Sequence, residues 1–216
     1  MKQLHSIAAL CLISSLFLLG GCDNKAETAP TQKVPPLSTA ATDNSKIIQH
    51  EPTVQSALYF KDGLALYQKF QLTEAIADYD KAIKADPENY MVYTAKGIAL
   101  CFNGDYPQGM ALIQKTLDMR ADYVPAFYDM AMAYKLQHQY DQSLTWFHRV
   151  IVADEDNTWS YYGIATIYAD QGNSDEALCY LRKAVALGGE DVKAAARTQD
   201  HFEQMRTMEP FQDLVR

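Results

Sequence analysis

The sequence has few of the residues that crosslink a chain or bind nucleic acid. Its 216 residues include four cysteines, and 19 basic residues against 27 acidic ones give a formal charge of −8. No arginine-rich run or basic patch stands out. Nucleic acid is therefore not expected as a ligand, because it is held mainly through basic side chains on its phosphates. The acidic balance also argues against wide electrostatic contact with anionic lipid headgroups.

The sequence also lacks the residue spacings of common catalytic and metal sites. It has no glycine-rich phosphate loop and no Gly-x-Ser-x-Gly or Ser-x-x-Lys motif. The run Asp154–Asp156 lacks the spacing of a calcium loop, so we expect a solvated turn there. We expect no enzymatic activity, no metal and no cofactor. None of the histidines lies in a metal-binding pattern, and solvated side chains are expected for His5, His50, His138, His148 and His201.

Long apolar runs are scarce, and the one near the N-terminus is too short to span a bilayer stably. It extends from Ile7 to Leu19, follows Lys2 and ends in a Leu-Gly-Gly-Cys sequence that closes at Cys22. This ending resembles a bacterial lipobox. The resemblance implies that residues 1–21 are a lipoprotein signal peptide and that Cys22 is lipidated, as by palmitate. An ordinary cleaved signal peptide with an incidental cysteine is the alternative.

Residues 22–52 have the composition of a flexible tether. They contain four of the eight prolines, several threonines and alanines, and no aromatic residue. Such a segment buries too little apolar surface to offset the entropy of ordering it. Asp23 after Cys22 resembles the inner-membrane retention signal of enterobacterial lipoproteins. The expected location is therefore the periplasmic side of the cell envelope, with the inner membrane favoured over the outer membrane.

From position 56 to position 191, one pattern recurs four times without insertion or deletion. Apolar residues within each unit recur at helical spacing, and a unit of about 34 residues accommodates two short helices and two tight turns. We interpret the small residues, which return twelve positions apart, as the places where the two antiparallel helices of a unit cross closely. These small residues are first Gly63, Gly97, Ala131 and Ala165, and then Ala75, Gly109, Ser143 and Ala177.

This pattern resembles the tetratricopeptide repeat (TPR) family. The first unit matches the family motif nearly throughout, through Tyr59, Gly63, Leu66, Ala75, Tyr79, Ala82 and Pro87. Later units depart from the motif in part, and the fourth has Gly189 in place of proline. The resemblance implies an all-α fold, a TPR solenoid of about four helix-turn-helix repeats. The repeats are expected over 56–89, 90–123, 124–157 and 158–191, within a TPR domain over 53–191.

Capping residues and turn residues predict where the helices of these repeats begin and end. In the first unit we expect helices over about 53–69 and 73–85. Asp105 is expected to cap a helix, and Asn173 with Glu176 is expected to form a capping box. Residues 192–216 do not continue the repeat, and a stack needs a cap over its last apolar face. We therefore expect a C-terminal helical cap there, with one helix from Asp191 to Met205 and a second over about 209–215.

The two cysteines of the repeats are not expected to bond to each other. Cys101 lies in the second repeat and Cys179 in the fourth. Disulfide partners need Cα atoms within about 7 Å of each other. Repeats that are not neighbours in a stack lie farther apart than that.

The family resemblance also implies a groove lined by the first helix of each repeat. At the groove-facing positions the chain has mainly apolar and aromatic residues, with a single lysine. The candidate binding residues are Phe60, Leu64, Tyr67, Met91, Thr94, Tyr128, Met132, Lys135, Trp159 and Tyr162. Family members that clamp a C-terminal carboxylate have several basic residues at these positions, so such a clamp is not supported. Exposed aromatic surface of this kind favours a protein partner.

Two classes of function remain open from the sequence. The first is a non-catalytic adaptor or scaffold, anchored to the membrane by its N-terminal lipid, that binds a peptide or helix of an envelope protein in its groove. An assembly factor for a pilus, secretin or outer-membrane machine, similar to a pilotin, is the alternative within that class. The second is a remote alternative, an enzyme whose site combines Lys135, Asp170 and His138. Self-association into a homo-oligomer is also open.

Overall fold

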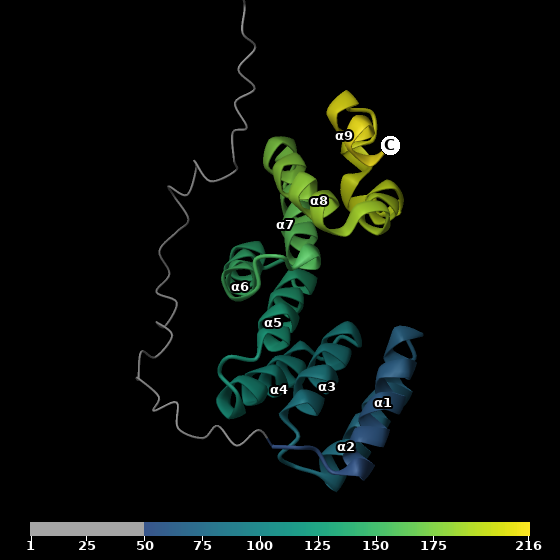
Figure 1. Ribbon diagram of the computed structural model, residues 1–216, viewed down its shortest axis with the longest axis vertical. Coiled ribbons are helices and arrows are strands. Elements are labelled where there is room, and N and C mark those ends of the chain that lie inside the picture. The colour runs from purple at the N-terminus through teal and green to yellow at the C-terminus, as the bar shows by residue number, and fades with distance from the viewer. Residues whose placement is uncertain (1–49) are drawn as a thin grey trace, which may run out of the picture. The chain divides into compact units, whose positions relative to one another are not determined.

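A computed structural model describes residues 50–216. The expected signal peptide, Cys22 and nearly all of the expected tether lie outside the described residues. The described chain is helical, and none of its helices is long and apolar enough to cross a membrane. In chain order the helices are α1 (Val54–Gln68), α2 (Leu72–Ala85), α3 (Tyr90–Phe102), α4 (Tyr106–Met119), α5 (Val124–Leu136), α6 (Tyr140–Ala153), α7 (Thr158–Asp170), α8 (Ser174–Thr198), the 3-10 helix η2 (Asp200–Met205) and α9 (Glu209–Val215) (Figure 1).

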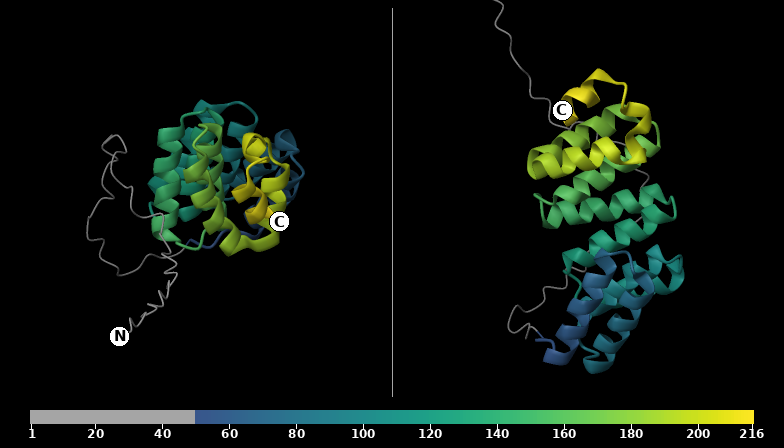
Figure 2. Two further views of the ribbon diagram at one scale, coloured as in Figure 1. Left: turned by 90° about the horizontal axis from the view of Figure 1, so that it is seen from above. Right: turned by 90° about the vertical axis from the view of Figure 1, so that its right-hand side faces the viewer.

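The helices form four antiparallel pairs, as the sequence predicted. Each odd-numbered helix from α1 to α7, called here an A helix, packs against the helix that follows it, called a B helix. Consecutive A helices also contact one another, and each B helix contacts the next A helix. Figure 2 shows the pairs following one another in chain order up to the C-terminal helices. The TPR solenoid with a C-terminal cap is therefore confirmed.

The small residues lie where the two helices of a pair cross, as predicted. A Cβ atom added at Gly97 would lie 2.7 Å from the carbonyl oxygen of Gly109, and one added at Gly109 would lie 2.5 Å from the carbonyl oxygen of Gly97. In the third repeat the buried Ser143 hydroxyl donates a 2.7 Å hydrogen bond to the carbonyl oxygen of Ala131. These contacts require small side chains, which explains why the positions recur.

The turn inside each helix pair has a left-handed residue at the same repeat position. Phe70, Gly104, His138 and Gly172 are equivalent in the four repeats and have φ values of 57°, 92°, 56° and 74°. Glycine adopts this conformation readily, whereas other residues are strained in it. Two of the four turns are therefore made with an unfavourable residue.

A recurring cation–π contact joins the two helices of each pair. The aromatic residue four positions before the first small residue lies beneath a basic side chain of the B helix. The shortest of these contacts places Lys115 Nζ 4.0 Å from the centre of the Tyr93 ring. The other pairs are Tyr59 with Lys81, Phe127 with Arg149, and Tyr161 with Lys183. Electrostatic attraction between the cation and the aromatic face thus adds to the packing of the two helices.

Of the helix caps predicted at Asp105 and Asn173, the structure contains the first and lacks the second. The Asp105 side chain accepts a hydrogen bond from the backbone N–H of Gln108, as predicted. The predicted capping box at Asn173 is wrong, because this side chain makes no capping hydrogen bond to α8. Asn157 instead caps α7, accepting from the backbone N–H of Ser160.

The cap departs from the predicted pair of helices in one respect. Gly189 has a non-helical backbone (φ 55°, ψ −132°) and kinks α8, so the fourth repeat ends there and the rest of α8 turns back. The expected helix from Asp191 to Met205 is divided, because α8 ends at Thr198 and η2 follows. The expected second helix is α9. The cap buries Phe202, Met205, Phe211 and Val215 against residues of α7 and α8.

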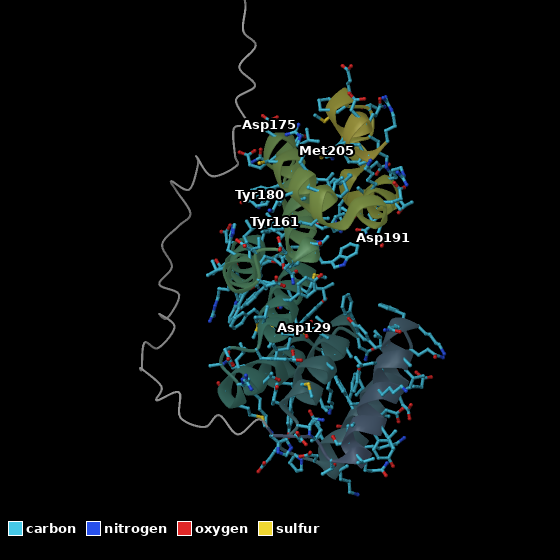
Figure 3. The ribbon with its side chains drawn as sticks, in the orientation of Figure 1. Asp129, Tyr161, Asp175, Tyr180, Asp191 and Met205 are labelled. Carbon is cyan, nitrogen blue, oxygen red and sulfur yellow. The ribbon has the colours of Figure 1, made fainter. Side chains whose placement is uncertain are left out.

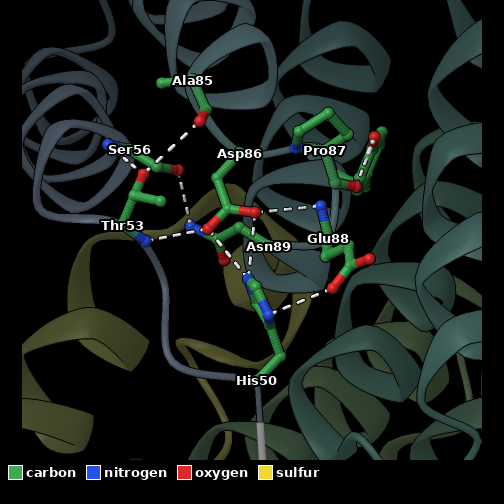
Figure 4. A network of polar contacts seen from close by, with 9 residues as sticks. His50, Thr53, Ser56, Ala85, Asp86, Pro87, Glu88 and Asn89 are labelled. Atoms are coloured by element: carbon green, nitrogen blue, oxygen red, sulfur yellow. Dashed lines mark hydrogen bonds and ion pairs between the residues drawn. The ribbon is translucent and has the colours of Figure 1, made fainter.

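The start of the described chain is fastened to the first repeat by a polar network (Figure 4). His50 Nε2 lies 2.9 Å from Oδ2 of the buried Asp86, and His50 Nδ1 lies 3.3 Å from Glu88. Asp86 also accepts a 2.8 Å hydrogen bond from the backbone N–H of Thr53. These hydrogen bonds help hold the pKa of Asp86 below its ordinary value, despite the opposing effect of burial. The expectation that His50 is solvated is therefore wrong.

Candidate functional site

The predicted groove residues lie on the A helices, and we call the surface that they form the A-helix face. Most of them are half-buried, because they also pack into the cores of their own repeats. Phe60, Leu64 and Tyr67 pack on the first-repeat core, and Tyr128 and Met132 pack on the core of the third. Met91 is half-buried as well, whereas Thr94 and Tyr162 are buried. Trp159 is the most exposed member, with 46% of its surface accessible.

Part of this face is hollowed into a cleft of about 420 Å³ where the third repeat meets the fourth. We call it the Asp129 cleft. Helix α5 contributes four of its lining residues, α7 contributes Trp159, and the loop between α6 and α7 contributes two polar residues. The cleft is lined by Val124, Pro125, Tyr128, Asp129, Asp154, Asn157 and Trp159. The structure thus brings together two predicted residues, Tyr128 and Trp159, with acidic side chains that sequence reasoning did not select.

Asp129 lies on α5, the third of the four A helices (Figure 3). Its Oδ2 atom accepts a 2.9 Å hydrogen bond from the hydroxyl of the buried Thr94. Although its side chain is half-buried rather than sealed, desolvation raises its pKa to about 7, against the opposing effect of the Thr94 hydrogen bond. Between residues 50 and 216, no basic side chain forms an ion pair with it.

Several tyrosines surround this carboxylate closely enough to sense its charge. Desolvation, followed by the charge of Asp129, raises the pKa of Tyr128 to about 12, and the charge of Asp129 also contributes to the pKa of about 12 at Tyr123. Desolvation and then Asp129 also lead the rise in the pKa of Tyr67 and of Tyr79. The Tyr79 hydroxyl is buried and has no hydrogen-bond partner. Asp129 is therefore an acidic group in an aromatic setting that partly shields it from water.

A second polar cluster ties the A-helix face to the cap. His201 of η2 lies 2.7 Å, through Nδ1, from Oδ1 of Asp170 on α7. Its Nε2 lies 3.4 Å from Nζ of Lys135 on α5. The two distances fit a neutral imidazole that donates from Nδ1 to the carboxylate and accepts from the ammonium group. Desolvation lowers the pKa of Lys135 to about 8, although the charge of Asp170 opposes this.

The groups of the hypothetical enzyme site belong to this cluster. Tyr140 links them, because its hydroxyl lies 2.9 Å from His138 Nδ1 and 3.4 Å from Asp170 Oδ2. Lys135, Asp170 and His138 are thus connected through His201 and Tyr140. The distances between the three groups therefore do not exclude a shared site. The contacts link η2 to α5 and α7, and His201, expected to be solvated, is 35% exposed and also paired with Asp170. No group of three or more potential metal ligands occurs in the part of the chain that the structure describes.

Cys101 and Cys179 are not bonded to each other, as predicted. Cys101 is buried and free, so no disulfide joins it to Cys179. Desolvation, with smaller effects from Asp129 and Asp105, raises the pKa of the Cys101 thiol to about 11. Cys101 is therefore a poor nucleophile near neutral pH.

Comparisons with known proteins identify the repeats. Two models described as tetratricopeptide repeat match residues 56–89, 78–111 and 160–187. The matched segments fall in the first, second and fourth predicted repeats, so the chain contains tetratricopeptide repeats. A search of curated protein sequences found no significant match.

Solved structures share the fold at low sequence identity. TTC0263, described as a thermophilic TPR protein of Thermus thermophilus, is 15% identical with a TM-score of 0.64, covering 74% of this chain and 86% of its own. PilF of Pseudomonas aeruginosa is 13% identical with a TM-score of 0.60, covering 74% and 73%. MamA is 20% identical with a TM-score of 0.52, covering 64% and 81%. At these identities the likeness shows the fold alone.

Proposed function

We propose that this tetratricopeptide-repeat chain is a membrane-anchored adaptor of the periplasm that docks a peptide or helix of another envelope protein on its A-helix face. The observation that carries this proposal is the Asp129 cleft, which the exposed Trp159 lines together with Tyr128. Exposed aromatic residues beside a cleft are typical anchors of protein interfaces, since they bury a large area at little entropic cost. TPR folds are generally non-catalytic interaction scaffolds, which agrees with this role.

The proposed location rests on the N-terminal sequence. The apolar run from Ile7 to Leu19, followed by Gly20, Gly21 and Cys22, supports lipidation of Cys22. Asp23 supports retention at the inner membrane. Acyl chains buried in a bilayer contribute about 0.8 kcal/mol per CH₂ group, and several chains anchor far more firmly than one. The mature chain would then keep 18 basic and 27 acidic residues, since residues 1–21 contain one lysine and no acid.

Partner capture with a groove variant tests the docking role. The tagged chain, expressed in its own host, is recovered from detergent-solubilised envelope beside a Trp159→Ala variant. A Val152→Ala variant serves as the control, because Val152 lies on the B helix α6 and is 86% exposed. We expect a specific envelope protein to be retained by the native chain and the control, and lost from the Trp159 variant at unchanged thermal stability.

The outcomes separate the alternatives. A secretin or pilus component among the specifically lost proteins would establish the assembly role. Equal capture by the native chain and both variants would contradict docking at the Asp129 cleft. Recovery of only a second copy of the chain would replace the adaptor by a homo-oligomer.

Mass spectrometry of the N-terminal peptide tests the anchor. The peptide that begins at Cys22 is expected to carry diacylglycerol on its sulfur, and a Cys22→Ser variant is expected to move from the membrane fraction to the soluble one. An unmodified Cys22 in a chain cleaved elsewhere would support an ordinary signal peptide.

A further inference from the structure

The Asp129 cleft has an unbalanced charge. Asp129 and Asp154 both line it, and none of the residues that line it is basic. Asp154 accepts a 3.0 Å hydrogen bond from the Asn157 side chain and is exposed at the rim. Among the described residues, the one donor to the Asp129 carboxylate is the Thr94 hydroxyl. One carboxyl group therefore lies at the rim and a second lies deeper, without a cation paired to either among the described residues.

A half-buried carboxylate without a cationic partner is costly in a free protein. Water solvates it incompletely, and one neutral hydroxyl replaces only part of the lost hydration. Its desolvated state is reflected in the raised pKa of Asp129. A positive charge brought beside Asp129 would be attracted more strongly than at an exposed carboxylate, because the surroundings screen it less.

The aromatic residues around Asp129 favour the same kind of ligand. Tyr128 and Trp159 line the cleft together with this carboxylate. Aromatic faces attract ammonium and guanidinium groups, and the attraction strengthens where water is excluded. Carboxylate and aromatic rings together therefore match a long side chain with an apolar stem and a cationic end.

We propose that the Asp129 cleft receives a lysine or arginine side chain of the docked protein, whose cationic end pairs with Asp129 while its stem and an adjacent apolar residue pack on Tyr128 and Trp159. This inference rests on the proposed function and specifies its ligand. The cleft would thus prefer a cationic group, whereas the carboxylate clamp considered from the sequence binds an anionic one. The partner segment is a basic, partly apolar stretch of polypeptide.

A phage-displayed library of random linear peptides, selected on the full-length chain in detergent, tests the inference. We expect the selected peptides to be enriched in lysine or arginine next to an aromatic or aliphatic residue. Parallel selections use an Asp129→Asn variant, which keeps the acceptor for Thr94 but removes the charge. An Asp118→Asn variant, altered at an exposed position of α4, has the same net charge and is the control.

A double-mutant cycle measures the contact itself. The tightest selected peptide is compared with a version in which norleucine or citrulline replaces its cationic residue. On the native chain and on the Asp118 variant, we expect the neutral peptide to bind at least about tenfold more weakly than the basic peptide. On the Asp129 variant, we expect the two peptides to bind with nearly equal affinity. If replacing the cationic residue weakened binding equally on the native and Asp129→Asn chains, the proposed pairing with Asp129 would be overturned.

The result also separates this inference from the docking proposal. Selected peptides that lose binding to Trp159→Ala but contain no basic enrichment would leave the docking role intact and overturn the cation site. Peptides that bind Trp159→Ala as well as the native chain would overturn both, and so would a selection that yields no binding peptide.

Discussion

The hydroxyl of Thr94 on α3 donates a 2.9 Å hydrogen bond to Asp129 on α5, joining the second repeat to the third. Among the described residues, this is the one hydrogen bond to a carboxylate that lines the same cleft as Tyr128 and Trp159. Because it comes from a neutral group, it does not compensate the negative charge of Asp129. The hydrogen bond from Thr94 therefore stabilises the native geometry, while the charge of Asp129 remains available to a partner.

The pH dependence of stability reports on Asp129. Its folded pKa of about 7 is raised above the unfolded value, so the unfolded chain releases the proton first as pH rises. The contribution of Asp129 to stability is therefore largest below pH ~4 and is lost as pH rises to about 7, by up to about 1.4 kcal/mol per pH unit. Urea denaturation of the native chain and Asp129→Asn across this range should show a smaller decline in the variant. Parallel curves would contradict the raised pKa.

The helix crossing of the second repeat depends on the absence of a side chain at Gly109. In Gly109→Ala the new methyl would lie 2.5 Å from both the Gly97 carbonyl oxygen and Cys101 Sγ. The helices must separate, and we expect a net loss of about 1–3 kcal/mol despite the better helix propensity of alanine. Thermal and urea unfolding measure the loss. An unchanged or raised stability would show that the crossing is looser than described.

The turn residue Phe70 tests the backbone strain of a left-handed conformation. Phe70→Gly and Phe70→Ala both remove the edge contact between the Phe70 and Phe102 rings, so their difference isolates the backbone. The glycine variant should be more stable than the alanine variant by about 1 kcal/mol, since φ is 57°. The equivalent Gly104→Ala, where the methyl has open space, should lose about the same amount. Equal stabilities for the two Phe70 variants would contradict the left-handed turn.

The link between His201 and Asp170 should hold the cap in place. His201→Ala removes the contacts to Asp170 and Lys135, and a partly exposed pair of this kind contributes about 0.5–1 kcal/mol. Hydrogen exchange should speed up in η2 and α9 while α1 and α2 keep their protection. Gln204→Ala, exposed in the same 3-10 helix, is the control and should leave the exchange unchanged. Equal exchange in both variants would show that apolar packing alone holds the cap.

The repeat plan could be predicted from the sequence because it depends on local and periodic signals. Gly97 and Gly109 identified a crossing, and Asp105 identified a cap, since each interaction joins residues close in the chain. The capping box at Asn173 failed because the residue types permit a hydrogen bond without requiring it. The basic residues of the cation–π pairs were missed, although one recurs at the same position of every repeat.

The candidate site was predictable only in part. Tyr128 and Trp159 were selected from the positions that face the groove in TPR proteins, but Asp129 occupies another position. A signal for it existed, because the equivalent residues of the other repeats are Lys61, Ala95 and Gly163, which makes an acidic residue unusual there. The contact of His201 with Lys135 could not be inferred, since it depends on how the cap folds back across 66 residues of chain.

Site-specific photo-crosslinking in living cells shows whether a partner docks at the Asp129 cleft. A photoreactive phenylalanine analogue is placed at Trp159 in the cleft, or at Val152 on the B helix α6, where 86% of the side chain is exposed. We expect a discrete crosslinked protein from position 159 that is absent from position 152 and is diminished by Asp129→Asn. A partner crosslinked from position 152 and not from position 159 would place binding away from the A-helix face and refute the docking proposal.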